Sequence, residues 1–273
     1  MADKKLDLAG QLRVRTHSRV QLKDQQAGRD FGWQEQRARD EFARLTSELA
    51  ELQYKLYADG RFGVLVVLQA IDGGGKDSTI RHVFSAFNPQ GCNVRAFKAP
   101  SAEELRHDYL WRIHQHVPAH GEITVFNRSH YEDVLIVRVD QLVARATWQA
   151  RYQQINDFER MLDASNIKVV KIFLHVSKAV QRQRLEERIR EPRKQWKFEI
   201  GDLAKRGQWN AYQQAYGDML GLCNTAHAPW YVVPADKKWL RDLAVAQILR
   251  NTLKSLPLRF PPPQFDPRKV RVK

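Results

Sequence analysis

The residues best suited to chemistry lie between positions 64 and 80. An apolar, β-branched run ends in Asp72, three glycines follow, and Lys76 comes next. Consecutive glycines can adopt positive φ angles and turn several backbone N–H groups toward one anion, while a helix N-terminus and a lysine add positive charge. The pattern predicts a phosphate-binding loop made of Gly73, Gly74, Gly75, Lys76, Asp77 and Ser78.

This loop matches the P-loop consensus imperfectly. Ala70 stands where the first glycine of the consensus belongs, and Asp77 stands where Ser or Thr follows the lysine. A glycine-rich turn can also join a strand to a helix without binding a ligand, and this interpretation stays open. We expect Asp72 to bind Mg²⁺, with Mn²⁺ as an alternative, because a hard cation prefers oxygen ligands.

A second group of polar side chains, residues 127–133, follows a predicted strand at 122–126 and reads Asn-Arg-Ser-His-Tyr-Glu-Asp. Ligands bind at the carboxyl edge of an open α/β sheet, so these groups are expected beside the glycine loop. Arg128 can hold phosphate oxygens through two N–H groups. The alternatives are surface ion pairs of Arg128 with Glu132 or Asp133, or of Glu132 with another arginine.

A strongly basic segment, residues 188–206, carries seven Lys or Arg and three Asp or Glu. Pro192 is expected to end the preceding helix and leave the segment free to move, and Trp196 and Phe198 interrupt the charges. We interpret it as a basic lid, although a charge run can also be a solvated face. The predicted phosphate contacts are Arg188, Arg193, Lys194 and Lys197, together with Lys98 at the end of the second strand, for which a solvated surface position is the alternative.

Alternating strands and helices must position these groups. Apolar residues recur with helical spacing from 33 to 57, which predicts a core-facing helix. Strands are predicted at 64–71, 92–98, 122–126, 169–176 and 230–233, and further helices at 76–87, 101–116, 140–165, 209–223 and 240–253. Ser101 and Glu104 have the spacing of a capping box, which predicts the start of the helix at 101–116. This order predicts an α/β fold, a P-loop kinase-like three-layer sandwich with a five-stranded parallel sheet and right-handed crossovers.

Composition divides the chain into three parts. Residues 1–32 form a basic arm, with Arg13, Arg15, Arg19 and Lys23, that is either solvated or wrapped around the core. Residues 33–256 form the kinase core. Residues 257–273 form a Pro-rich tail without helix or strand.

Length, charge and cysteines limit the function further. A chain of 273 residues suits one α/β domain, and a net charge of +14 should attract polyanions such as nucleic acid, acidic membrane or polyphosphate. Cys92 and Cys223 form no metal-ligand cluster, which suits a reducing cytosol. The N-terminal residues show no apolar signal core and no apolar run spans a bilayer, so we expect a cytoplasmic protein with no membrane partner.

Six segments taken together resemble polyphosphate kinase 2. The resemblance covers roughly residues 10 to 260 in order. Asp77 and Glu132 are similar to the class III pattern of that family, whose members phosphorylate nucleoside mono- and diphosphates from polyphosphate. Other classes carry Asp where Asn127 stands, so direct metal binding by Asn127 stays open, and Glu191 replaces the usual Asp before proline. The segments are Ala-Ile-Asp-Gly-Gly-Gly-Lys-Asp at 70–77, Asn-Pro-Gln-Gly at 88–91, Lys-Ala-Pro-Ser at 98–101, Phe-Asn-Arg-Ser-His-Tyr-Glu-Asp at 126–133, Pro-Arg-Lys-Gln-Trp-Lys-Phe at 192–198 and Trp-Tyr-Val-Val-Pro-Ala-Asp at 230–236.

The resemblance implies a kinase that transfers phosphate from inorganic polyphosphate to AMP and ADP, reversibly, and that assembles as a homodimer or homotetramer. Phosphoryl transfer needs its oxygens neutralised and its reactants held in line. On that basis we expect catalytic roles for Asp72, Lys76, Arg128 and Arg188. The nucleotide acceptor is expected at Asn127, Arg128, Glu132 and Asp133.

Two other functions share some of these sequence features. An ATP-dependent nucleoside monophosphate kinase similar to thymidylate kinase would share the fold and a basic lid, but Ala70 and Asp77 count against it. A P-loop nucleic-acid-binding protein is favoured only by the net charge. It would need aromatic stacking platforms or a groove-reading helix, and neither pattern stands out, so no nucleic acid is expected.

Overall fold

The computed structural model of the chain describes residues 7–16, 18 and 20–272. Its centre is a parallel sheet with the strand order β2-β3-β1-β4-β5. Every residue of β1 is buried, because this strand pairs on both edges and is covered on both faces. The predicted five-stranded parallel sheet is confirmed. The strands are β1 (Gly63–Gln69), β2 (Cys92–Ala96), β3 (Ile123–Asn127), β4 (Ile167–His175) and β5 (Trp230–Pro234).

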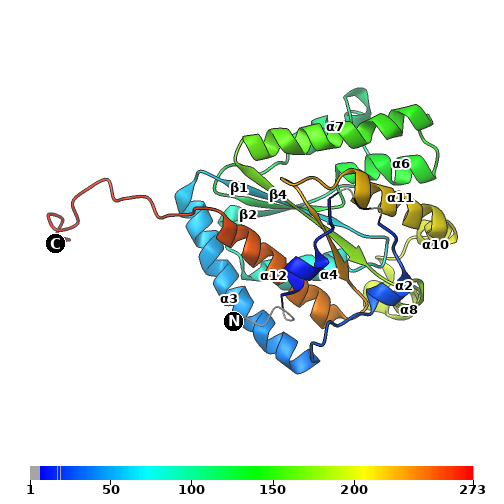
Figure 1. Cartoon of the computed structure of the whole chain (residues 1–273), viewed down its shortest axis with the longest axis horizontal. Coiled ribbons are helices and arrows are strands. Elements are labelled where there is room, and N and C mark those ends of the chain that lie inside the picture. The colour runs from blue at the N-terminus through cyan, green and yellow to red at the C-terminus, as the bar shows by residue number, and fades with distance from the viewer. Residues whose placement is uncertain (1–6, 17, 19, 273) are drawn as a thin grey trace.

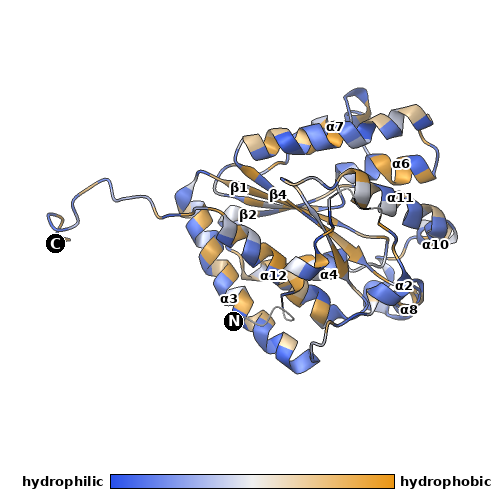
Figure 2. Cartoon of the chain, in the orientation of Figure 1, coloured by the Kyte–Doolittle hydropathy of each residue, from blue (hydrophilic) through white to orange (hydrophobic). Residues whose placement is uncertain are grey.

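Helices cover both faces of the sheet (Figure 1). α3 (Glu35–Asp59), α4 (Lys76–Val83) and α12 (Lys238–Ser255) lie on one side, and α6 (Ile136–Val139), α7 (Arg145–Ala164) and α11 (Trp209–Leu222) lie on the other. Figure 2 shows mostly hydrophobic strands between helices that carry both hydrophilic and hydrophobic residues. The predicted three-layer α/β sandwich is therefore confirmed.

The region after β2 differs from the prediction. The expected capping box forms, because the Ser101 N–H donates to Glu104 Oε2 at 2.7 Å and the Glu104 N–H donates to Ser101 Oγ at 3.2 Å. No long helix follows it, and only the 3₁₀ turn η4 (Glu104–Arg106) and the short α5 (Trp111–His114) form. A cap satisfies the first N–H groups but supplies no apolar face, and Leu105 is 69% exposed.

The described part of the N-terminal arm packs on the core. α1 (Leu8–Leu12) buries Leu8 and Leu12, and the Val14 N–H donates at 2.9 Å to the carbonyl of Trp230, the first residue of β5. A short α2 (Asp24–Ala27) follows. These contacts favour the wrapped alternative over a solvated tail. Arg19 lies outside the described residues.

The C-terminal segment is tethered only at its start. The Arg61 guanidinium donates to the Pro257 carbonyl at 2.8 Å, and the Arg259 N–H donates to Asp59 Oδ2 at 2.6 Å. Residues 257–272 form neither helix nor strand, and Figure 1 shows this segment leaving the body. The division into arm, core and tail stays a prediction. Among the helices described, none combines the length and the hydropathy needed to cross a bilayer.

Candidate functional site

The glycine loop joins β1 to α4 at the carboxyl edge of the sheet. Gly73 and Gly75 have φ angles of 83° and 104°, which residues with side chains rarely adopt. A Cβ on Gly74 would lie 2.5 Å from the Cβ of Ala70. Ala70 therefore fits here because position 74 has no side chain, and the loop conformation requires glycine at three consecutive positions.

Asp72 lies at the centre of a charge cluster. Its Oδ1 accepts a hydrogen bond from Arg128 Nη2 at 2.5 Å, and its Oδ2 accepts one from Lys205 Nζ at 3.0 Å. Burial acts to raise the pKa of Asp72, but the charges of Lys76, Arg128 and Lys205 outweigh it and hold the pKa well below its ordinary value. The carboxylate is therefore ionised at neutral pH, with a cation at each oxygen.

Lys76 is buried inside the loop that precedes it. Its Nζ donates to the carbonyl oxygen of Ala70 at 2.7 Å. Burial lowers the pKa of this ammonium group, and the negative charge of Asp72 opposes that shift. The charges of Lys76, the loop lysine, and Asp72, the predicted metal ligand, therefore influence each other directly.

Arg128 reaches Asp72 from an unusual backbone conformation. Its φ angle is 62°, in the left-handed region that costs a residue with a side chain roughly 1–2 kcal/mol. Its N–H donates to the Leu68 carbonyl at 3.1 Å, so the backbone is tied to β1 directly after β3 ends. Backbone strain of this kind clusters at functional sites, where the surrounding contacts maintain it.

Asn127 and Glu132 lie beside the loop as predicted. Asn127 Nδ2 donates to Asp77 Oδ1 at 2.8 Å, which joins the end of β3 to the start of α4. Glu132 belongs to the 3₁₀ turn η5 (His130–Val134) and accepts a hydrogen bond from Gln69 Nε2 at 3.3 Å.

Asp133 belongs to a different cluster. Its Oδ1 accepts a hydrogen bond from Arg151 of α7 at 3.0 Å. Burial raises the pKa of Asp133 to about 6, although the charges of Arg151 and Arg112 oppose this shift. Of the four predicted acceptor residues, Arg128 and Glu132 line one cleft beside the loop, whereas Asn127 and Asp133 are absent from its lining.

A cleft beside the loop combines charges with aromatic and apolar groups. Sequence reasoning did not single out Lys205, although it lies within the predicted lid. Tyr212 and Tyr216 are four residues apart on α11, a spacing that ordinary core positions share, so no local signal could identify them. The cleft is lined by Ala70, Ile71, Asp72, Arg128, Glu132, Ile136, Lys205, Tyr212 and Tyr216.

The predicted lid contacts the loop through two lysines. It begins in the last turn of α8 (Lys178–Arg190), contains α9 (Pro192–Gln195) and ends in α10 (Gly201–Gly207). Lys197 Nζ lies 3.7 Å from Asp77 Oδ2, and Lys205 of α10 pairs with Asp72.

The side chain of Arg188, near the end of α8, contacts other residues of the predicted lid. Its Nη1 donates to the Lys197 carbonyl at 3.3 Å and pairs with Asp202 Oδ2 at 3.3 Å. In this conformation Arg188 holds the segment together, and Lys197 faces the loop.

Three predicted phosphate contacts lie apart from the loop. Lys194 forms ion pairs with Glu187 and Glu191. Arg193 and Lys98 are exposed, and the Lys98 carbonyl accepts a hydrogen bond from Arg112. Within the described residues, no hydrogen bond or ion pair joins any of the three side chains to the glycine loop. Nearby glutamates neutralise Lys194, and that pairing depends on how α8 and α9 fold together.

Two arginines that sequence reasoning missed support the loop. Arg184 of α8 donates through Nη1 to the carbonyls of Gly73 and Gly74, at 3.1 and 3.2 Å. The buried Arg241 of α12 donates to Ser78 Oγ at 3.0 Å. Both residues are more than a hundred positions from the loop in sequence, which no local motif could indicate.

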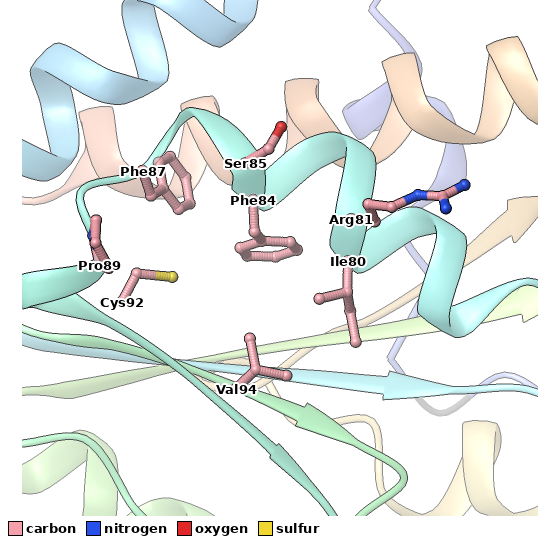
Figure 3. A pocket seen from close by; sticks show the side chains of 8 residues that line it. All are labelled: Ile80, Arg81, Phe84, Ser85, Phe87, Pro89, Cys92 and Val94. Carbon is pink, nitrogen blue, oxygen red and sulfur yellow. The ribbon is translucent and has the colours of Figure 1, made fainter.

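A separate groove of about 280 Å³ lies between α4 and the edge strand β2 (Figure 3). Its lining is mainly apolar and aromatic, with one charged side chain, and it includes none of the predicted site residues. We therefore place the candidate site at the polar cleft. The groove is lined by Ile80, Arg81, Phe84, Ser85, Phe87, Pro89, Cys92 and Val94.

The site suits a cation shared with a substrate better than a permanently bound one. Across residues 7–16, 18 and 20–272, no three His, Cys, Asp or Glu side chains gather as a metal cage. Two carboxylates, those of Asp72 and Glu132, line the cleft beside the glycine loop, and Asp72 directly precedes the loop. This donor set fits a hard divalent cation that takes its other ligands from phosphate oxygens and water.

The fold and this site define an α/β protein of the P-loop kinase class. The family model described as polyphosphate kinase 2 matches residues 32–259. The chain is 48% identical over 262 residues to the AMP/ADP-polyphosphate phosphotransferase of Meiothermus ruber, covering 95% of this chain and 98% of the relative. It therefore belongs to the polyphosphate kinase 2 family, as the sequence resemblance predicted.

Two further relatives agree. The chain is 47% identical over 225 residues to the ADP-polyphosphate phosphotransferase of Rhodopseudomonas palustris, covering 78% of each chain. The crystal structure of polyphosphate kinase 2 from Arthrobacter aurescens TC1 superposes with a TM-score of 0.90 at 40% identity, covering 97% of this chain and 95% of that one.

Proposed function

We propose that this protein transfers a phosphoryl group from inorganic polyphosphate to nucleoside mono- and diphosphates, converting AMP to ADP and ADP to ATP in a reversible reaction. The observation that carries the proposal is the convergence of Lys76, Arg128 and Lys205 on the ionised carboxylate of Asp72 beside the glycine loop. A polyanionic donor and an anionic acceptor need such a concentration of positive charge. The names of the relatives agree with both substrates.

The residues of the cleft take roles that phosphoryl transfer requires. In this proposal the loop N–H groups and Lys76 hold the transferring group, and Arg128 neutralises its oxygens from the end of β3. Asp72 holds Mg²⁺, or alternatively Mn²⁺, which neutralises phosphate oxygens when it is bound. Lys197 and Arg188 act from the lid. The predicted contacts of Arg193, Lys194 and Lys98 would require rearrangement.

In this proposal the acceptor nucleotide lies on the side of Arg128 away from the glycine loop. Glu132 and Asn127 lie beside its predicted phosphate position, and Ile136, Tyr212 and Tyr216 offer an apolar and aromatic surface for the nucleoside. Asp133 forms an ion pair with Arg151, so any effect of Asp133 on the acceptor nucleotide is exerted through that arginine. A cleft that combines charged side chains with apolar and aromatic ones matches a nucleotide better than a second polyphosphate chain.

One assay separates the candidate functions. Purified protein is incubated with Mg²⁺ and AMP or ADP, with either long-chain polyphosphate or ATP as the donor, and the nucleotides are resolved by chromatography. We expect ADP and ATP from polyphosphate alone. Product from AMP with ATP only would indicate an ATP-dependent monophosphate kinase. No product from either donor, together with tight DNA or RNA binding, would indicate a nucleic-acid-binding protein.

We also infer a cytoplasmic location and a homodimer or homotetramer, as the sequence predicted. Size-exclusion chromatography with light scattering measures the assembly.

A further inference from the structure

Both oxygens of the Asp72 carboxylate already carry a cation in this structure. Arg128 Nη2 lies 2.5 Å from Oδ1, and Lys205 Nζ lies 3.0 Å from Oδ2. Lys205 is 133 positions away in sequence and belongs to α10, whereas Arg128 comes from the sheet edge. The side chains of Lys205 and Asp72 are 23% and 14% exposed, so water screens this pair only in part.

A divalent cation at Asp72 would compete with these groups. Lys76, Arg128 and Lys205 all act on this one carboxylate, and further positive charge within a few ångströms is repelled strongly where water is scarce. One of the three cations is therefore expected to leave when a metal ion binds.

Lys205 is the group best able to leave. Lys76 is buried and donates to the Ala70 carbonyl, and Arg128 makes a shorter contact with Asp72 than Lys205 does, 2.5 Å against 3.0 Å. Lys205 has a flexible four-carbon stem and lines the open cleft. The backbone of α10 is held nearby, because Arg206 donates to Gln181 Oε1 at 2.6 Å. The ammonium group can therefore change partners while its helix stays in place.

We propose that Lys205 is an exchangeable counter-ion that becomes a catalytic residue. It neutralises Asp72 in the ligand-free enzyme, and it moves to the phosphate oxygens in the cleft when a divalent cation binds Asp72. The protein thus keeps a buried carboxylate paired at every stage and gains one more cation for the transferring group. This inference rests on the proposed function for its second half, whereas the competition at Asp72 does not depend on it.

The first test measures metal affinity without any substrate. Mn²⁺ is titrated into the ligand-free protein, and free Mn²⁺ is followed by electron paramagnetic resonance. Lys205→Met should bind Mn²⁺ about tenfold or more tightly than the wild type, because a competing charge is gone. Lys178→Met, which removes an exposed lysine of α8, is the matched control and should leave the affinity unchanged. Equal affinity in Lys205→Met and wild type would overturn the competition.

The second test measures the phosphate contact. Tripolyphosphate binding at saturating Mg²⁺ is followed by calorimetry, and it should weaken about tenfold in Lys205→Met, with partial recovery in Lys205→Arg. Unchanged tripolyphosphate binding would overturn the move to phosphate. If Lys205→Met does not fold, Lys205→Gln replaces it in both titrations. A wild type that makes no ATP from polyphosphate would refute the proposed function, and the Mn²⁺ titration would still decide the competition at Asp72.

Discussion

At Asp72, burial and charge act on one carboxylate in opposite directions, and charge prevails. An ionised oxygen ligand can therefore be kept beside the glycine loop although its carboxylate is largely buried. The same cations that keep Asp72 ionised are suited to a polyphosphate chain. One small set of residues thus serves both the resting protein and the proposed reaction.

Asp72→Asn and Lys76→Ala should each lower kcat by orders of magnitude while the protein stays folded. Each removes a charge that acts on the transition state, which costs several kcal/mol of barrier, and ~1.4 kcal/mol is tenfold in rate. The assay uses ADP, polyphosphate and Mg²⁺, with circular dichroism and the thermal midpoint as controls. Activity within roughly threefold of wild type in either folded variant would exclude that residue from the mechanism.

Glu132→Asn should lower AMP phosphorylation more than ADP phosphorylation. A carboxylate beside Arg128 repels a longer phosphate chain, and it can hold a metal ion or an arginine so that the shorter nucleotide lies in line. The quantity to measure is the ratio of kcat/KM for AMP to that for ADP, at fixed polyphosphate and Mg²⁺. Asp133→Asn is the matched control, because Asp133 faces Arg151 and lies outside the cleft lining. The same ratio in Glu132→Asn and wild type would leave Glu132 as a structural carboxylate.

At the scale of elements, the segment from the end of α8 to α10 has two kinds of contact. Its own ion pairs, such as that of Arg188 with Asp202, hold it together, while Lys197 and Lys205 join it to the glycine loop. Trp196 is 76% exposed and Ile200 is 83% exposed, so part of the segment has no covering layer. These features suit an element whose position depends on an anion in the cleft.

Polyphosphate should slow tryptic cleavage after Arg193 and Lys194. A bound polyanion attracts the cations of this segment, so the ligand should hold the segment more firmly on the loop. Cleavage is followed by mass spectrometry with and without polyphosphate at concentrations that saturate turnover. Cleavage after Arg268 in the C-terminal tail gives an internal control and should not change. If both sites are cut equally fast in either condition, the segment is a fixed surface.

At the scale of the whole molecule, a buried polar network joins the sheet to the layer that carries the acceptor residues. Lys171 of β4 donates to Glu159 of α7 at 2.5 Å and to the Tyr131 hydroxyl at 2.9 Å. Tyr131 immediately precedes Glu132 in η5. The network thus connects the interior of the core to the position of a proposed substrate contact.

Lys171→Met should lower the free energy of unfolding by about 3–5 kcal/mol, because it leaves the Glu159 carboxylate buried without its partner. Guanidinium denaturation at neutral pH measures the change. The double variant Lys171→Met with Glu159→Leu should recover a large part of the loss, since no buried charge is left unpaired. Arg182→Met, which breaks an exposed pair with Glu186, is the control and should change stability little. A loss in Lys171→Met no larger than in this control would contradict a structural role for the pair.

The sequence by itself determined the five strands, the glycine loop and the placement of Asp72, Lys76 and Arg128 at one edge of the sheet. These features are local, because a buried strand needs a continuous apolar run and the loop needs glycines at fixed positions. It also predicted a cap at Ser101, which forms, but not the absence of the helix behind it. A cap is a local hydrogen-bond pattern, whereas a helix of that length needs a surface to pack on.

Only the tertiary structure decided which cations meet Asp72 and which are used elsewhere. Lys205 and Lys194 lie in the same basic segment, yet Lys205 reaches the loop and Lys194 pairs with two glutamates. Arg184 and Arg241 support the loop from helices far along the chain. Long charged side chains have similar local preferences wherever they occur, so their partners depend on distances between elements that only folding brings together.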